Sequence, residues 1–266
     1  MKKRVWFILV LAFILPFSFS ITVFSSGFNI DVSRAGQGVF EVVGIPNYNR
    51  VRVIVEKEGT RDRYIYFLST INRNVFPLQM GDGKYTITLL ENVIRNESKK
   101  IAAKVVDVKG LSESELFTQS IQLIDFESSK EAVPSLSEVI AAVSDEKKLS
   151  MVYEYIIDNI DYDFDKNPQT LFDYLPVIDE TYISGKGICY DYAALLAGVL
   201  RANGIPVKLQ KGYTSKIPNV FHAWNAVLIG DTWFKIDTTY DRQLRKADLD
   251  ITMIKDREVF TIVREF

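Results

Sequence analysis

Cysteine and histidine are almost absent from this chain. Its 266 residues contain one cysteine, Cys189, and one histidine, His222. A single cysteine cannot close a disulfide within the chain, so a disulfide-stapled fold is excluded. One imidazole and one thiol are also too few for the usual zinc sites. We therefore expect no metal and no other cofactor.

Long runs of one charge are missing as well. The chain has 32 lysines and arginines against 34 aspartates and glutamates, and its formal net charge is −2. No basic run lies outside the extreme N-terminus, so we expect no nucleic-acid partner. The 47% hydrophobic and 12% aromatic content is enough to bury a core.

Alternating acids at residues 161–165 resemble part of a calcium-binding loop. An EF-hand loop requires glycine at its sixth position and glutamate at its twelfth. Those positions hold Lys166 and Phe172. We therefore interpret this segment as an exposed strand or loop.

Residues 1–26 are predicted to be a signal peptide or an N-terminal anchor. Lys2, Lys3 and Arg4 precede an apolar run, and small residues follow near Ser18. The apolar stretch 5–24 also approaches the length of a membrane-spanning helix, so an uncleaved anchor stays open. A cleaved signal peptide and an uncleaved anchor both predict a secreted or cell-envelope protein. The protein would touch a membrane only through this segment, if it is not cleaved. The oligomeric state cannot be read from the sequence.

Residues 27–126 are predicted to form an all-β sandwich of the immunoglobulin-like kind. Val51, Val53 and Val55 alternate with polar residues, as in a half-buried strand. About seven short strands separated by turn residues fit between Phe28 and Val108. Ser112–Pro134 is interpreted as a connection, with a further strand possible over Ser120–Phe126.

Residues 127–266 are predicted to form an α+β domain. Ser135 and Glu138 have the spacing of a capping box, and a helix is expected over about 145–159. A second helix is predicted to begin at Cys189 and to end near Asn203. The N-terminus of that helix would stabilise a thiolate, and the amide of Cys189 could bind an oxyanion.

The strands 220–229 and 232–239 are predicted to form a hairpin through Gly230 and Asp231. That register sets Asp237 diagonal to His222 on the same face, where the acid could orient the imidazole toward the thiol. Each of these residues alone is more often structural than catalytic. Their joint occurrence favours a Cys189, His222, Asp237 active site. Candidate walls of its substrate cleft are Tyr190, Trp224 and Trp233.

Four blocks of the sequence resemble the transglutaminase-like superfamily: 187–196, 201–207, 222–225 and 233–239. The resemblance implies a papain-like core in which Cys189 is the nucleophile, His222 the base and Asp237 the orienting acid. Many relatives have proline directly after the acid. This chain has Thr238, which we expect to be accommodated in a strand.

Members of the superfamily include crosslinking enzymes, peptidases, amidases and inactive copies, so the resemblance does not choose a reaction. We expect an exported acyl-transfer enzyme that acts on amide bonds of proteins or cell-wall peptides through a thioester. A thiol peptidase or amidase with the same triad and an inactive surface binding module are the alternatives. A protein or peptide substrate is the expected partner.

Overall fold

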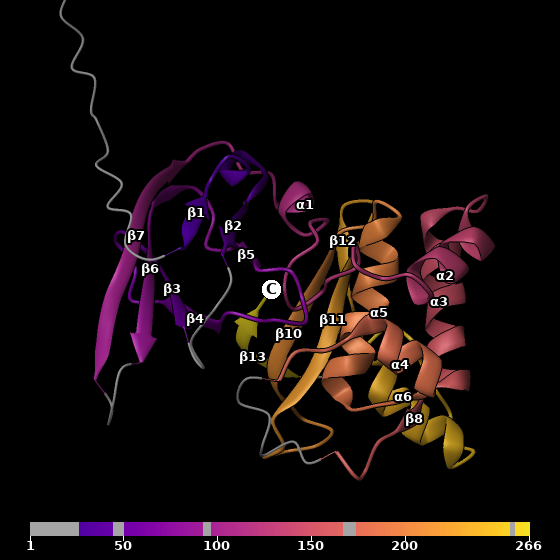
Figure 1. Ribbon diagram of the computed structural model, residues 1–266. Coiled ribbons are helices and arrows are strands. Elements are labelled where there is room, and N and C mark those ends of the chain that lie inside the picture. Colours follow the sequence, from indigo (N-terminus) through magenta and orange to yellow (C-terminus); the bar gives the residue numbers. More distant parts are fainter. Residues whose placement is uncertain (1–26, 45–50, 93–96, 167–173, 256–258) are drawn as a thin grey trace, which may run out of the picture.

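The computed structural model is a mixed α+β structure that describes residues 27–44, 51–92, 97–166, 174–255 and 259–266. The N-terminal strands lie on one side, the helices lie on the other, and a second group of strands runs between them (Figure 1). The predicted signal peptide or anchor, residues 1–26, lies outside the described residues. Within the described part of the chain, no helix is both long enough and apolar enough to cross a membrane.

Two antiparallel sheets form the N-terminal part. One has the strand order β1-β2-β5 and the other β4-β3-β6-β7, which gives seven strands in the described part of residues 27–108. The alternating valines of β3 are buried, as their spacing predicts. The rings of Phe76 in β5 and Tyr66 in β4 are 5.0 Å apart, so the two sheets share a core. The elements are β1 Asn29–Asp31, the 3-10 turn η1 Ala35–Gln37, β2 Val39–Val43, β3 Val51–Lys57, β4 Arg63–Phe67, β5 Val75–Pro77, β6 Gly83–Asn92 and β7 Ser98–Val108.

The two-sheet arrangement and the strand number agree with the prediction, whereas kinship with the immunoglobulin fold stays a prediction. The connection that follows contains the short helix α1, Glu113–Leu116. The further strand considered over Ser120–Phe126 is reduced to a single bridge between Ile121 and Ile124.

A buried helix, α5, is the centre of the C-terminal part. It packs against β11 and β10 of an antiparallel sheet with the order β12-β11-β10-β13, and α2, α3, α4 and α6 surround it (Figure 1). Helix α3 has the extent predicted from its apolar face. The elements are α2 Ala132–Ile140, α3 Asp145–Asn159, β8 Asp161–Tyr162, α4 Ile178–Ser184, β9 Lys186–Gly187, α5 Cys189–Ala202, β10 Val207–Thr214, β11 His222–Ile229, β12 Thr232–Ile236, α6 Thr238–Lys246 and β13 Phe260–Glu265.

The start of α2 differs from the prediction. Ser135 and Glu138 do not form a capping box, because the helix already begins at Ala132. The cap comes instead from Asp179 in α4, whose carboxylate accepts the N–H groups of Lys130 at 2.6 Å and Ala132 at 2.9 Å. A carboxylate suits this position because it satisfies free amides and complements the helix dipole.

Polar contacts join the C-terminal helices to the loop after β4, to the segment after α1 and to the end of β13. Arg201 at the end of α5 donates to the carbonyl oxygens of Gln119 at 2.8 Å and Phe266 at 2.9 Å. Burial lowers the pKa of this guanidinium to about 9. Asn72 donates to the carbonyl oxygen of Pro176 at 3.0 Å. These contacts hold the loop after β4 and the end of β13 beside the helical half.

Candidate active site

Cys189 is a free, partly exposed cysteine at the first position of α5, as predicted. The N-cap residue, Ile188, has no side-chain oxygen with which to cap the helix. The backbone N–H of Ile188 instead donates to the carboxylate of Asp191 at 2.9 Å. The thiol therefore lies at a helix N-terminus, where the amides and the helix dipole stabilise a thiolate.

Asp191 holds this helix start in place, a role that was not predicted from the sequence. Its side chain is buried and accepts hydrogen bonds from the Tyr174 hydroxyl at 2.5 Å and from Lys166 Nζ at 3.1 Å. Its two carboxylate oxygens thus link Lys166, Tyr174 and the start of α5. An acid at the third helical position, where the capping box has one, was the available signal.

The hairpin carries His222 and has the predicted register. Ile229 is opposite Thr232 across the turn, and Asn225 is opposite Ile236. No register shift interrupts this pairing. The predicted register of the hairpin is therefore confirmed.

Asp237 itself lies outside the hairpin. Strand β12 ends at Ile236, and Asp237 is the N-cap of α6, where its Oδ1 accepts the N–H of Tyr240 at 3.0 Å. The prediction that Thr238 and Thr239 continue a strand is wrong, because they form the first turn of this helix. Proline and threonine both fit this first helical position, because its N–H has no acceptor within the helix.

The imidazole of His222 lies between the carboxylate and the thiol. Its Nε2 is 2.8 Å from Asp237 Oδ2, and both residues are buried. Cys189 is close enough to this ring to raise its pKa, so the three predicted residues come together at the imidazole. Burial lowers the pKa of His222, but the charge and hydrogen bond of Asp237, followed by the contact with Cys189, raise it to about 10 overall. The site therefore favours an imidazolium.

Neighbours on β11 fix the imidazole relative to α5. Trp224 lies against His222 with 6.3 Å between ring centroids, and its indole N–H donates to Gln210 at 2.8 Å. Asn225 donates to the carbonyl oxygen of Ala193 in α5 at 3.0 Å. Asn225 was not singled out from the sequence, although a polar residue in an otherwise apolar strand is a recognisable signal.

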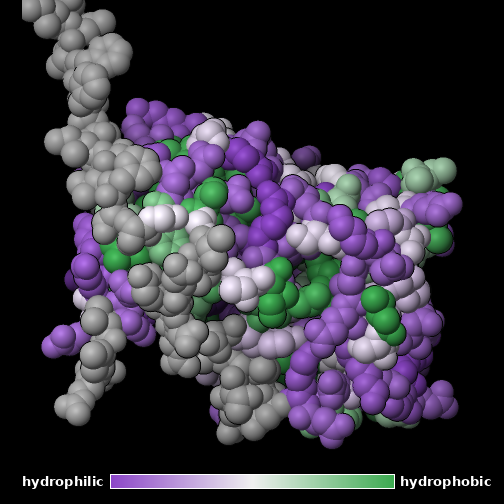
Figure 2. Space-filling model, viewed as in Figure 1, coloured by the Kyte–Doolittle hydropathy of each residue, from purple (hydrophilic) through white to green (hydrophobic). Residues whose placement is uncertain are grey.

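A cavity of about 640 Å³ is lined by the sequence neighbours of Cys189 and His222, although none of the three candidate catalytic residues lines it. Tyr190, next to Cys189, and Phe221, next to His222, both line it, and β4 forms its opposite wall. Figure 2 shows apolar side chains gathered around a hollow in the middle of this face. Among the predicted cleft residues, Tyr190 lines this cavity, but Trp224 and Trp233 do not.

Both tryptophans have other surroundings. Trp224 is only 1% exposed and serves as a wall behind the imidazole. Trp233 packs against the ring of Phe117 at 5.9 Å, and Lys208 Nζ lies 4.5 Å from its ring centroid. Trp233 thus packs against the C-terminal end of α1.

The acidic stretch 161–165 makes protein contacts. Asp161 accepts hydrogen bonds from Lys246 and Arg242, both at 2.8 Å, and these two cations lower its pKa to about 2. Within the residues described, no three His, Cys, Asp or Glu side chains are grouped so that they could hold a metal ion.

A family model described as the transglutaminase-like superfamily matches residues 135–238. This region is a transglutaminase-like domain. The match includes Cys189, His222 and Asp237, and it also includes most of α2, helices α3 to α5 and the hairpin described above.

Three further similarities accompany this transglutaminase-like match. UPF0252 protein MJ1282 of Methanocaldococcus jannaschii is 28% identical over 159 residues, which cover 51% of this chain and 45% of that protein. The matched region thus spans about half the length of this curated relative. A candidate cysteine protease from Cytophaga hutchinsonii has a TM-score of 0.43 at 15% identity, covering 93% of this chain and 81% of its own. A TGase crystal structure has a TM-score of 0.30 at 16% identity, covering 57% of this chain and 43% of its own.

Proposed function

We propose that this protein is an exported, thiol-dependent acyl-transfer enzyme that acts on amide bonds of proteins or cell-wall peptides through a thioester. The observation that carries the proposal is the buried imidazole of His222, which bonds the Asp237 carboxylate and whose pKa is raised by both Asp237 and the neighbouring Cys189. A thiol used only for packing needs no imidazole beside it and no carboxylate that holds that imidazole.

The arrangement supports a two-step reaction. The Cys189 thiolate attacks the carbonyl carbon of the amide, and the imidazolium of His222 gives its proton to the leaving amine as the C–N bond breaks. A second nucleophile, an amine or water, then attacks the thioester carbonyl and gives a proton to the imidazole, and the C–S bond breaks to release the acyl product and restore the Cys189 thiolate. Asp237 keeps the ring oriented and stabilises its charged form without taking a proton itself.

The second nucleophile defines two candidate activities. An amine would make the enzyme a transglutaminase-like transferase, whereas water would make it a peptidase or amidase. Transfer to an amine requires that water be kept from the thioester. We favour transfer, because the cavity beside Cys189 is walled mainly by aromatic and aliphatic side chains.

Alkylation of the thiol tests whether the site is active. Because Cys189 is the only cysteine, each iodoacetamide adduct detected by intact mass reports on this residue alone. At pH 6 we expect the folded protein to react faster than the same protein in urea, and His222→Gln to remove that advantage. A folded protein that reacts more slowly than the unfolded chain would support the inactive binding module instead.

Product analysis separates the two activities. Cell-surface proteins and cell-wall peptides are incubated with the enzyme and a labelled primary amine, and the products are analysed by mass spectrometry. Conjugates that carry the amine would support transfer, whereas cleaved products without it would support a peptidase. Cys189→Ala is the matched control and should give neither.

The proposal extends to the flanking regions. Residues 27–126 would form an immunoglobulin-like module, supported by seven strands in two antiparallel sheets in the described residues. Residues 1–26 would direct export, as the basic start and apolar run indicate. N-terminal sequencing of the exported protein would show whether the segment is cleaved.

A further inference from the structure

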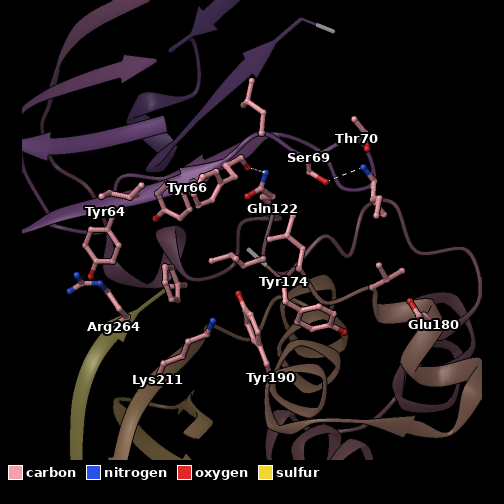
Figure 3. Close-up of a pocket in the computed structure, with 18 of the residues that line it drawn as sticks. Tyr64, Tyr66, Ser69, Thr70, Gln122, Tyr174, Glu180, Tyr190, Lys211 and Arg264 are labelled. Carbon is pink, nitrogen blue, oxygen red and sulfur yellow. Dashed lines mark hydrogen bonds between the residues drawn. The ribbon is translucent and has the colours of Figure 1, made fainter. Parts of the chain in front are cut away.

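The cavity beside Cys189 belongs to both halves of the protein. Strand β4 and the loop after it form one wall, while α5, β10 and β13 supply the other. Tyr190 and Lys211 extend from α5 and β10 toward Tyr64 and Tyr66 of β4 (Figure 3). Its volume of about 640 Å³ lies in the usual range for pockets that hold small molecules or peptide segments.

Two polar groups in this cavity lack a hydrogen-bond partner among the described residues. Lys211 Nζ lies 3.1 Å from the centroid of the Tyr190 ring and forms no ion pair or hydrogen bond there. The hydroxyl of Tyr190, a residue only 7% exposed, is buried and has no partner either. A buried hydroxyl without a partner costs about 1–3 kcal/mol, so an unpaired group aimed at a cavity indicates a ligand.

The remaining lining combines apolar surface with a small excess of positive charge. Arg264 lies over the ring of Tyr64 at 5.3 Å, and Glu180 is the acidic residue among those lining the cavity. With Lys211, two cationic side chains therefore face one carboxylate. The aromatic and aliphatic walls suit an uncharged segment next to an anionic group.

We infer that this cavity is a substrate subsite for a peptide carboxylate. The carboxylate would pair with Lys211 Nζ and accept a hydrogen bond from the hydroxyl of Tyr190. The inference rests on the function proposed above and names the class of substrate that the site would select. A carboxylate supplies acceptors for both unpaired donors, and a charge-assisted bond is the stronger kind of hydrogen bond. The preferred substrate would thus carry a free carboxylate close to the amide that reacts.

The charge of Lys211 supports a pH-dependent subsite. Burial lowers the pKa of Lys211 to about 7, although the negative charge of Cys189 raises it in part. A carboxylate pairs with the ammonium form, so binding should weaken as the pH rises through about 7. The other titratable and charged groups that line the cavity are Tyr64 and Tyr66 from β4, Tyr174 before α4, Glu180 from α4, Tyr190 from α5 and Arg264 from β13.

The test measures binding in the full-length Cys189→Ala protein, so that it does not depend on turnover. Isothermal calorimetry compares four probes: acetyl-Leu-Gln, which has only a C-terminal carboxylate; acetyl-Leu-Glu amide, which has only a side-chain carboxylate; acetyl-Leu-Glu, which has both; and acetyl-Leu-Gln amide, which has none. The proposal predicts that at least one singly charged probe binds about tenfold more tightly than the uncharged probe at pH 6. Which one does so identifies the source of the carboxylate.

Variants assign the effect to the two donors. Lys211→Met should abolish the preference for the charged probe, and Tyr190→Phe should weaken it by several-fold. The matched control is Lys208→Met, because Lys208 lies on the same strand and also packs over aromatic rings, but does not line the cavity. It should leave the preference unchanged.

Equal binding of all four probes would overturn the inference, as would an unchanged preference in Lys211→Met. Circular dichroism checks that each variant is folded, and Lys211→Arg, which keeps the charge, should retain the preference if Lys211→Met does not fold. Failure here would leave the acyl-transfer proposal intact, because thiol alkylation tests that proposal independently. A thiol that does not react, combined with carboxylate-selective binding, would instead identify a binding module.

Discussion

Replacing Asp237 with asparagine separates the two contacts of this residue. Its Oδ1 caps α6 through the N–H of Tyr240, and its Oδ2 bonds His222. Asparagine is as good an N-cap as aspartate, so α6 should keep its start. The rise in the pKa of His222 from 6.5 to about 10 corresponds to on the order of 5 kcal/mol in favour of the imidazolium. Because Asp237 is the largest cause that raises this pKa, most of that preference should disappear.

Two measurements follow the loss in Asp237→Asn. The rate of alkylation of Cys189 at pH 6 should fall, because the thiolate loses its charged neighbour, and turnover should fall roughly 10²- to 10⁴-fold. Circular dichroism should show a native fold, but urea unfolding at pH 6 should show lower stability than the native protein, because the favourable interaction with the imidazolium is lost. In Asp237→Ala the lost cap should cost about 1 kcal/mol more. An asparagine variant with native alkylation and turnover would refute the orienting role of the acid.

Three further outcomes are expected in urea or thermal unfolding. The raised pKa of His222 contributes stability that is fully present below about pH 6.5 and is lost as the pH rises through about 10. The free energy of unfolding should therefore decline between these two pH values, and it should decline less in Asp237→Asn. Asp179→Ala removes the acceptor for the amides at the start of α2 and should cost about 1–3 kcal/mol, whereas a loss below 0.5 kcal/mol would argue against the remote cap. Gly212→Ala would place a methyl group 2.0 Å from a carbonyl oxygen of β13, and it should cost more than about 2 kcal/mol or detach that strand. Gly36→Ala, with no atom within 4 Å of the added carbon, is the control and should change stability little.

Local patterns in the chain were enough to locate the three residues at the candidate active site. The apolar face of α5 and the terminal Asn203 and Gly204 delimit a helix that opens at Cys189. The two-residue connection at Gly230 sets the hairpin register, because the number of residues in a tight turn determines which residues pair. His222 and Asp237 could therefore be placed near each other without any knowledge of the rest of the fold.

Capping was less predictable because the capping group can come from a distant part of the chain. Asp179 is 47 residues from Ala132, whose amide it accepts, so no spacing rule could find it. The N-cap of α6 was missed for another reason, since Asp237 directly follows a strand and the strand pattern continued into Thr238. Asp237 follows the last residue of β12 and caps α6, so its position fits both a strand pattern and a helix start.

The order of residues along the chain by itself predicted the class of chemistry, since the only thiol lies at a helix start, the only imidazole lies in a hairpin and an acid directly follows that hairpin. Only the tertiary structure decided what surrounds them. The cavity requires β4 to lie opposite α5 and β10, and its unpaired Lys211 and Tyr190 become visible as donors only once their neighbours are packed. Pairing within a hairpin depends on the residues next to it in sequence, whereas burial and the lack of a partner depend on every segment that packs around a group.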